Sequence, residues 1–416
     1  MNYYILKCFA CGKEYNDHQK YVYRCEKCGG SLEIIYDYDE LVHKINTRIL
    51  EERKMGVWKY KELLPVRDDS KIITLGEGGT KLHNCKRLAE VLGIKKLYAK
   101  DETRNPTGTY KDRPATVGIS KTLEFGAKTI AIASDGNAGP ATAAYAAKAG
   151  LKCYVFMPSL TPIERIVQVQ AFGGKVILIK GTVSDCIDIL TEVQAYYGWY
   201  QLTTAIPSNP YQAEGSKTIA YEICEDLMWN VPNWVVIPVG GGGLLTANWK
   251  GFKEFFKLGI ITKLPKIVAV QAEGCAPLVK AYNGDKEKIE IWGKPRTIAI
   301  PIGVPFPLDG TAALKAIRES KGIAVAVSDE EILKVEKLLA QTEGIFAEPA
   351  GVTSLAGVKK LIGEGIINSE ERVVFEVTGT GLKDLKSAMK TCEKPPCIEA
   401  KPKEVEDAVR FWERQY

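Results

Sequence analysis

The chain has 416 residues, with 56 basic and 51 acidic side chains and a net charge of +5. This composition is ordinary for a globular protein, and a chain of this length can bury a large core in two or three structural units. The small net charge, without a basic cluster interleaved with aromatics, argues against a nucleic-acid partner. No apolar run approaches the roughly 18 residues of a membrane helix, and the N-terminus lacks a signal-peptide layout. We therefore expect a cytoplasmic protein with no membrane partner.

Two Cys-x-x-Cys pairs lie near the N-terminus, formed by Cys8, Cys11, Cys25 and Cys28. Four thiolates at this spacing suit a tetrahedral structural zinc, so residues 1–36 are predicted to form a zinc ribbon. A catalytic zinc would need an open position, which four cysteines do not leave. A redox dithiol and a nucleic-acid-binding ribbon are the alternatives. The repeated motif argues against the first and the modest charge against the second.

The next stretch connects the ribbon to the motif-rich part of the chain. Residues 38–65 are charge-rich and favour helix, as expected of a connector that wraps the core. A glycine turn at 76–80 then leads to a predicted helix over 85–93 and a strand over 96–100.

A single lysine follows this strand in the segment Asn105–Arg113, which reads Asn-Pro-Thr-Gly-Thr-Tyr-Lys-Asp-Arg. Asn-Pro and Thr-Gly are turn signals, and the apolar spacing beyond them predicts a helix from Asp112 to about Gly126. Lys111 would then lie at a helix N-terminus, where a cation gains nothing from the helix dipole. A lysine amine joined to a carbonyl cofactor is a recognised form of covalent catalysis. A solvated lysine is the alternative.

Three further apolar runs lead into glycine turns and then into helical patterns. The turns are Ser134–Gly139, Gly240–Gly243 and Thr378–Asp384. The tetraglycine turn would offer backbone N–H donors and positive potential to a phosphate, without bulky side chains. An ordinary glycine-rich turn is the alternative interpretation of this tetraglycine segment.

Strands alternate with helices through most of the chain. The predicted strands are 129–133, 153–157, 175–179, 234–239, 267–271 and 372–377. Such alternation predicts parallel sheets with helices on both faces, and ligands at the carboxyl ends of the strands. The fold class is therefore α/β, in two lobes with a cleft between them.

Histidine is scarce and lies outside the motif-rich part of the chain: the three are His18, His43 and His83. This argues against a Ser-His-Asp or Cys-His mechanism and against a histidine-ligated catalytic metal. Near the C-terminus, Cys392 and Cys397 flank two prolines. A second metal or redox site is one interpretation, and a surface loop shaped by the prolines is the simpler one.

The four motifs in this order resemble the pyridoxal-phosphate enzymes of the tryptophan synthase β-subunit class and, within it, the threonine synthases. The resemblance runs from Leu75 through Glu348-Pro349 to Thr378, and four ordered motifs are specific where one glycine run would not be. It implies fold type II of these enzymes, a catalytic domain at 37–416 with a smaller mobile lobe at about 112–204, and a homodimer. Threonine synthases of this kind often carry an N-terminal zinc ribbon.

The resemblance also implies roles for individual residues. Lys111 would hold pyridoxal 5'-phosphate as a Schiff base and then shuttle protons. Gly240, Gly241, Gly242 and Gly243 would bind the cofactor's phosphate. The remaining contacts are implied for Asn137, at the phenolic oxygen, and Thr378, at the pyridine nitrogen. A hydroxyl at that nitrogen suits eliminations and replacements at the β or γ carbon.

The substrate carboxylate would be received by the backbone amides of Ser134, Asp135, Gly136 and Ala138, at the mouth of a helix. In threonine synthase the reaction converts O-phosphohomoserine and water to threonine and phosphate. This chain has Asp135 and Ala138 where the family usually has threonine, and an Asp-Gly-Asn loop is similar to that of diaminopropionate ammonia-lyases, where the aspartate takes part in proton removal. Asp135 is therefore a second candidate catalytic residue.

Several functions stay open at this stage. An ammonia-lyase acting on an amino acid such as 2,3-diaminopropionate, or a β-replacement enzyme, would use the same cofactor. A zinc-ribbon interaction protein with an inactive core, or an α/β protein that stores a phosphate ligand, would use none of the lysine chemistry.

Overall fold

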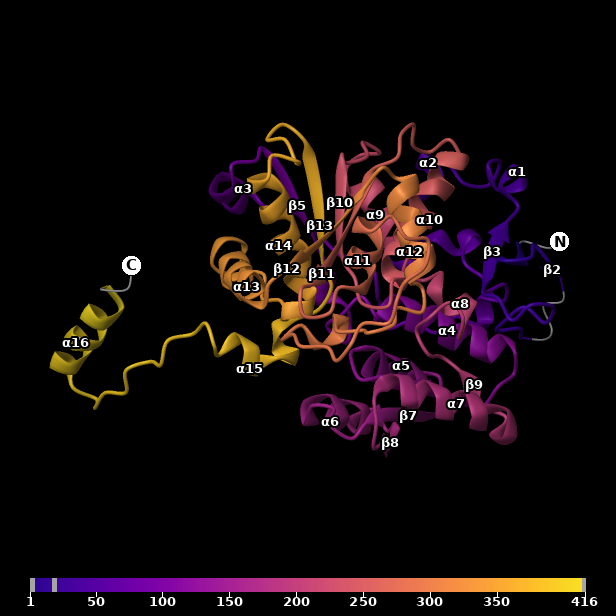
Figure 1. The fold of residues 1–416 in the computed structure, drawn as a ribbon, viewed down its shortest axis with the longest axis horizontal. Coiled ribbons are helices and arrows are strands. Elements are labelled where there is room, and N and C mark those ends of the chain that lie inside the picture. Colours follow the sequence, from indigo (N-terminus) through magenta and orange to yellow (C-terminus); the bar gives the residue numbers. More distant parts are fainter. Residues whose placement is uncertain (1–3, 17–20, 414–416) are drawn as a thin grey trace.

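The structure is a computed structural model that describes residues 4–16 and 21–413. Residues 1–3 and 17–20 of the predicted ribbon, His18 among them, lie outside the described residues. Three sheets organise the molecule, and the two larger ones form the body seen in Figure 1.

The N-terminal sheet is antiparallel, with strands in the order β2-β1-β3. These strands are β1 (Tyr4–Cys8), β2 (Glu14–Tyr15) and β3 (Leu32–Tyr36). Alternate residues of β1 and β3 are buried, as the two-residue period of a half-buried strand requires. The connector follows as α1 (Tyr38–Leu41), α2 (Thr47–Glu51) and a 3-10 helix at Val57–Leu63.

The larger body has a six-stranded sheet in the order β12-β11-β10-β13-β5-β4. Its strands are β4 (Leu82–Asn84), β5 (Lys96–Asp101), β10 (Trp234–Pro238), β11 (Lys266–Ala272), β12 (Ile323–Val327) and β13 (Arg372–Val377). Every pair is parallel except the edge pair β4 and β5. Strand residues alternate between two buried clusters, which places helices on both faces of the sheet.

One face of this sheet carries α9 (Thr218–Asp226), α10 (Gly243–Lys257), α11 (Pro277–Asn283) and α12 (Gly310–Glu319). The other face carries α3 (Lys86–Leu92), α13 (Asp329–Glu343) and α14 (Pro349–Gly363). The predicted α/β architecture, with parallel sheet covered by helices on both faces, is confirmed.

The smaller lobe has a parallel four-stranded sheet in the order β8-β7-β6-β9. Its strands are β6 (Thr129–Ala133), β7 (Lys152–Pro158), β8 (Lys175–Ile179) and β9 (Tyr200–Gln201). Helices α4 (Asp112–Glu124), α5 (Ala138–Lys148) and α6 (Ile163–Ala171) share one buried cluster, and α7 (Val183–Tyr197) packs on the opposite face. Helix α8 (Pro210–Ala213) leads back to the larger body.

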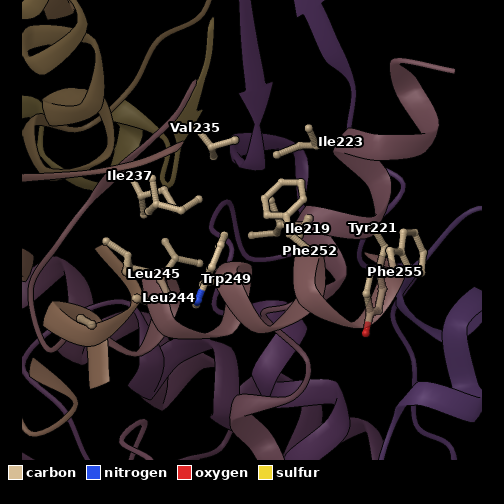
Figure 2. Packing of buried hydrophobic residues seen from close by; sticks show 14 of the residues in the cluster. Ile219, Tyr221, Ile223, Val235, Ile237, Leu244, Leu245, Trp249, Phe252 and Phe255 are labelled. Atoms are coloured by element: carbon tan, nitrogen blue, oxygen red, sulfur yellow. The ribbon is translucent and has the colours of Figure 1, made fainter. Parts of the chain in front are cut away.

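A hydrophobic cluster contains residues of β10, which precedes the tetraglycine turn, and of α10, which follows it (Figure 2). Ile237 of β10 precedes the turn, and Leu245 and Phe252 of α10 follow it, all fully buried. The rings of Tyr221 on α9 and Phe255 on α10 stack with centroids 4.2 Å apart. Packing on both sides therefore fixes where the turn lies, which its glycines could not do alone.

The third glycine turn follows the expected strand-turn-helix order, but its helix is short. After β13 the chain forms a 3-10 helix at Gly381–Lys383 and then the four-residue α15 (Leu385–Ala388). Within the turn, Gly379 forms a bridge with Thr109 and Thr380 forms one with Ala347, so the turn is joined to two distant segments.

The C-terminal helix α16 (Pro402–Glu413) lies away from the sheets at the end of an extended segment (Figure 1). Within the described ranges, none of the helices combines the length and the apolar character that spanning a bilayer would take.

Candidate active site

Lys111 is positioned by a loop that is hydrogen-bonded to the segment after β13. Lys111 caps α4 in a right-handed helical conformation, with φ −62°. The hydroxyl of Thr109 donates to the carbonyl of Thr378 over 3.0 Å, and the amide of Thr380 donates to the carbonyl of Gly108 over 2.9 Å. Gly108 has φ +76°, and a Cβ there would lie 2.7 Å from Cγ2 of Thr380, so the close approach of the two loops requires glycine.

Two residues beyond the lysine, Arg113 anchors α4 in the core. Its fully buried guanidinium binds both carboxylate oxygens of Glu102 at 2.6 and 2.8 Å and both of Glu222 at 2.7 Å. Burial acts to raise the pKa of Glu222, but Arg113 and Lys100 outweigh it and hold that pKa well below its usual range. The start of α4 is thus fixed by paired charges rather than by solvent contacts.

A cavity of about 570 Å³ lies at the carboxyl ends of the strands in both lobes. Its lining includes Lys111, Ser134, Asp135, Gly136, Asn137, Ala138, Gly240, Gly241, Gly242, Gly243 and Thr378. The structure therefore brings together all the residues that the sequence singled out for cofactor and substrate, from four segments far apart in the chain.

The lysine amine is held by a neutral hydroxyl next to an aromatic ring. Nζ of half-buried Lys111 donates to the hydroxyl of Thr204 over 3.2 Å and lies 4.7 Å from the centre of the Tyr110 ring. Among the described residues, no carboxylate forms an ion pair with this amine. An amine that is positioned by a hydroxyl and forms no ion pair remains available to react with a carbonyl group.

Asn137 is held by an acid from the larger body. Its Nδ2 donates to Oε1 of Glu348 over 2.6 Å, while its buried Oδ1 has no hydrogen-bond partner among the described residues. Glu348 immediately precedes α14, and burial raises the pKa of its carboxyl although Arg165, Lys383 and the bond from Asn137 act to lower it.

Arg165 of α6 reaches the same place from the small lobe. Its Nη1 donates to the backbone carbonyl of Asp135 over 2.9 Å, and its Nη2 lies 3.9 Å from Oε2 of Glu348. Its position therefore connects the Ser134–Ala138 loop to the larger body.

The Ser134–Ala138 loop is shaped by its own serine. The hydroxyl of Ser134 accepts from the amides of Gly136, at 3.2 Å, and Gly139, at 3.1 Å. The next helix, α5, begins at Ala138, so its free N–H groups face the cavity end of β6. Burial raises the pKa of the Asp135 carboxyl, although Arg165 and Lys111 act to lower it.

The tetraglycine turn has no room for side chains on its protein side. A Cβ at Gly240 would lie 3.1 Å from Cα of Ile302, and Gly242 has φ +96°. Nothing lies within 4 Å of a Cβ built at Gly241, so that residue faces open space. Because α10 starts at Gly243, its first N–H groups are free to bind an anion.

Asp309 lies directly beside this turn. Its Oδ2 is 2.8 Å from a Cβ built at Gly243, and its Oδ1 accepts from the amide of Ile206 over 3.0 Å. Burial raises the pKa of Asp309 to about 7, against the lowering effects of that amide and of Lys111. The anion-binding turn thus has a titratable neighbour near neutral pH.

These features fit pyridoxal phosphate. The turn offers backbone donors in a space that no side chain fills, and Lys111 has an amine without a counter-charge. The buried orphan Oδ1 of Asn137 and its amide stand ready for a polar ring substituent, and Thr378 lines the same cavity. The cavity thus offers polar groups to the phosphate, the aldehyde and the ring of the cofactor.

The four N-terminal cysteines also come together. The Sγ atoms of Cys8, Cys11, Cys25 and Cys28 all lie within 4.8 Å of one another. Tyr15 donates its hydroxyl hydrogen to Sγ of Cys25 over 3.2 Å. Four sulfurs in this arrangement could hold one metal ion.

Three cavity or neighbouring residues had no local signal in the sequence: Arg165, Thr204 and Asp309. Glu348 belongs to the Glu348-Pro349 segment that carries part of the family resemblance, but no role in the site was assigned to it from the sequence. The others lie on an ordinary amphipathic helix or in irregular loops, and only their contacts reveal them.

Comparisons with known proteins agree with this geometry. The family described as pyridoxal-phosphate dependent enzyme matches residues 73–379. The threonine synthase of Methanocaldococcus jannaschii is 46% identical over 396 residues, which cover 95% of this chain and 96% of that enzyme. The threonine synthase of Methanosarcina acetivorans is 43% identical over 407 residues, 98% of each chain.

Solved structures share the fold at lower identity. Threonine deaminase isoform 2 from Solanum lycopersicum, in its processed form, superposes with a TM-score of 0.65 at 22% identity, over 81% of this chain and 94% of that one. Diaminopropionate ammonia lyase from Escherichia coli gives a TM-score of 0.65 at 18% identity, over 79% of this chain and 94% of that one. With close relatives similar along nearly their whole length, the chain belongs to the threonine synthase family of pyridoxal-phosphate dependent enzymes.

Proposed function

We propose that the chain is a pyridoxal-phosphate-dependent lyase that converts O-phosphohomoserine and water to threonine and phosphate. The observation that carries this proposal is the cavity in which Lys111, Asn137, the tetraglycine turn and Thr378 meet, in a chain whose threonine synthase relatives match nearly end to end.

The cofactor would be held by four segments. Lys111 would bind its aldehyde covalently, and the N–H groups of Gly240–Gly243 would bind its phosphate. Asn137, oriented by Glu348, would donate to the phenolic oxygen, and the Thr378 hydroxyl would face the pyridine nitrogen. When bound, pyridoxal phosphate supplies an aldehyde for the substrate amine and a ring that takes up electrons.

The substrate carboxylate would bind the amides of Ser134, Asp135, Gly136 and Ala138 at the start of α5. We propose that the small lobe, at about 112–204, closes over it and excludes water until the leaving group has departed. Arg165 would help this closure, since it connects the loop of the small lobe to Glu348.

Lys111 would move protons at the substrate's α and β carbons. The hydroxyl of Thr204, to which the amine donates, would hold it in position for this transfer. Proton transfer by a positioned group of this kind contributes roughly 10²–10⁴-fold to a rate.

The test is to incubate purified holoenzyme with O-phosphohomoserine and to measure phosphate and threonine separately. We expect equal amounts of the two products. Phosphate without threonine, or no turnover, would mean that the reaction is another one on the same cofactor.

A second candidate, release of ammonia from a diamino acid such as 2,3-diaminopropionate, is favoured by the charges of the cavity. The lining residues that the structure describes include one cation, Lys111, and four carboxyl groups, Asp135, Asp188, Asp309 and Glu348. A side-chain ammonium would be attracted to such a lining, whereas a phosphate dianion gains little from it.

Substitution of Asp135 separates the two candidates. If Asp135 removes a proton from a diamino acid, Asp135→Asn should lower ammonia release by about 10²–10⁴-fold. If the carboxyl is only tolerated, Asp135→Thr should keep or raise threonine formation. Each variant is assayed with both substrates, and a holoenzyme spectrum confirms that the cofactor is still bound.

We also propose that residues 1–36 form a structural zinc ribbon in which Cys8, Cys11, Cys25 and Cys28 hold one zinc ion, with residues 37–416 as the catalytic domain. We further propose a homodimer in the cytoplasm, where reducing conditions keep the cysteines free to bind metal. Sedimentation that finds only monomer at micromolar concentration would contradict the dimer.

A further inference from the structure

A second cavity, of about 690 Å³, shares none of the lining residues of the first. It is bounded by the N-terminal part of the lysine loop, by α6 of the small lobe, by the segment just before Glu348 and by the segment after β13. Its lining is Asp101, Thr103–Gly108, Glu164, Arg165, Gln168, Gly344–Phe346, Thr380, Leu382 and Lys383.

Two basic side chains of this cavity are incompletely neutralised. Arg165 is 3% exposed, and its Nε has no hydrogen-bond partner among the described residues. The amine of Lys383 donates to the neutral Oε1 of Gln168 over 3.0 Å, and within the described ranges no carboxylate oxygen lies within 4 Å of it. Burial lowers the pKa of Lys383, although Glu348 and Asp112 act to raise it.

The two acidic side chains of the lining, Asp101 and Glu164, interact with groups other than Arg165 and Lys383. Asp101 accepts from the amide of Thr103 over 3.1 Å, and its Oδ2 lies 3.4 Å from Nε2 of His83 and 3.6 Å from Nε of Arg104. Glu164 lies 3.7 Å from the amine of Lys386, at the surface. Neither acid of the lining therefore pairs with Arg165 or Lys383.

We propose that this second cavity binds a small oxyanion, a phosphate or carboxylate group, between Arg165 of the small lobe and Lys383 of the larger body. Arg104 at the exposed rim adds a third cation that would draw the anion in. An anion here would give Lys383 a charge partner and would add a closer one for Arg165, whose Nη2 lies 3.9 Å from Glu348. The assignment holds whichever amino acid the active site accepts.

The site is coupled to the active site by direct contacts. Arg165 also donates to the carbonyl of Asp135, so an anion that pulls on its guanidinium acts on the loop proposed to bind the substrate carboxylate. Gly108 and Thr380 line the second cavity, and their hydrogen bond fixes the loop that carries Lys111. The bound anion would tie the two lobes together and so change substrate affinity.

The experiment uses holoenzyme, so that the cofactor occupies its own phosphate turn, at constant ionic strength. Inorganic phosphate and acetate are titrated separately by calorimetry into the wild type, Lys383→Met and Lys390→Met. Lys390 is the matched control, because it is an exposed lysine nearby in the chain that does not line the cavity. Phosphate binding alone would assign a phosphate site, and binding of both anions a general carboxylate or phosphate site.

We expect Lys383→Met to weaken anion binding by about tenfold or more, as for loss of a charge-assisted hydrogen bond, and Lys390→Met to leave it unchanged. Arg104→Met, at the exposed rim where folding is not at risk, should weaken binding less. In the wild type, the anion should also change the KM for the amino-acid substrate, and this effect should vanish in Lys383→Met. Absence of binding to the wild type, or equal binding to Lys383→Met, would overturn the proposal. Threonine formation is measured in a separate assay. A protein that forms no threonine could therefore still bind the anion, and the two proposals can fail independently.

Discussion

At the scale of single residues, Lys111 differs from four lysines that pack into the interior. The amines of Lys59, Lys100, Lys217 and Lys250 each form an ion pair with a carboxylate. Lys111 instead donates to a hydroxyl beside a cavity lined by glycine and asparagine. Its half-buried amine is not held in an ion pair, and in this cavity a carbonyl cofactor would give it a partner.

Lys111→Ala should therefore remove the near-visible absorption band of the bound cofactor, because the covalent link is lost. The control is Lys148→Ala, which changes an exposed lysine in the last turn of α5 and should leave the band intact. An absorption spectrum of each purified protein, taken after dialysis, makes the comparison. Retention of the wild-type band by Lys111→Ala would contradict the role assigned to this residue.

Asp309 predicts a pH dependence of cofactor affinity. With a pKa of about 7, its carboxyl loses its proton as the pH rises through neutrality and places a negative charge beside the tetraglycine turn. Affinity of the apoenzyme for pyridoxal phosphate should therefore fall as the pH rises from 6 to 8, within about one unit of that pKa. Asp309→Asn should flatten the dependence, since its amide stays neutral.

Titration of apoenzyme by cofactor fluorescence at several pH values provides the measurement. The cofactor's own phosphate titrates in the same way in each protein, so the difference between variants isolates Asp309. Asp188→Asn removes a carboxyl from the same cavity but from α7, away from the turn, and should keep the wild-type slope. Parallel curves for the wild type and Asp309→Asn would refute the explanation.

At the scale of elements, the start of α4 is the structural support of the active site. Arg113 pairs with Glu102, which follows β5, and with Glu222 on α9, so it joins the lysine helix to the six-stranded sheet and to one of its covering helices. All three side chains are fully buried. Removing the cation leaves two carboxylates in the interior without their main partner.

Arg113→Met should lower the free energy of unfolding by about 3–5 kcal/mol, the cost of breaking a buried ion pair from one side. Urea unfolding followed by circular dichroism measures the loss. Arg87→Met, at an exposed position of α3, serves as the control and should change stability by less than about 0.5 kcal/mol. A midpoint for Arg113→Met equal to that of the control would show that the cluster contributes nothing.

At the scale of the whole molecule, the N-terminal ribbon contacts both lobes. Tyr36 of β3 donates to Glu214 over 3.0 Å, and Lys250 of α10 donates to the carbonyl of Ile34 over 2.6 Å, both in the larger body. The amide of Gln201, in β9 of the small lobe, donates to the hydroxyl of Tyr23 over 2.8 Å. Loss of the ribbon's structure would therefore remove contacts from the catalytic body as well.

Cys8→Ser should lower the zinc content and reduce the thermal midpoint by several degrees, because metal binding and folding of such modules are coupled. The cofactor spectrum of the folded fraction should stay unchanged, since the cysteine cluster lines neither cavity. Metal analysis and thermal melts are compared with Cys392→Ser, which alters an exposed cysteine near the C-terminus. Protein prepared without chelator that contains no zinc would rule out the ribbon's metal site.

Local signals were enough to predict the strands and the turns that carry the candidate site. The strands at 129–133, 175–179 and 372–377 begin and end where apolar runs meet turn residues. The lysine helix starts at Asp112 as its spacing predicts. These features depend on neighbours in sequence, which is why pattern and spacing find them.

The sequence by itself determined the α/β fold class, the order of the motifs and the family to which they belong. Only the tertiary structure decided which residues support them. The Asn137–Glu348 hydrogen bond joins residues 211 positions apart, and neither Arg165 nor Asp309 has a neighbour in sequence that marks it. Likewise, the bridges from Thr109 and Ala347 to the last glycine turn join segments far apart in the chain, and the second cavity exists only where four distant segments meet. Contacts of this kind depend on how whole sheets pack, and packing leaves no periodic trace in the local sequence.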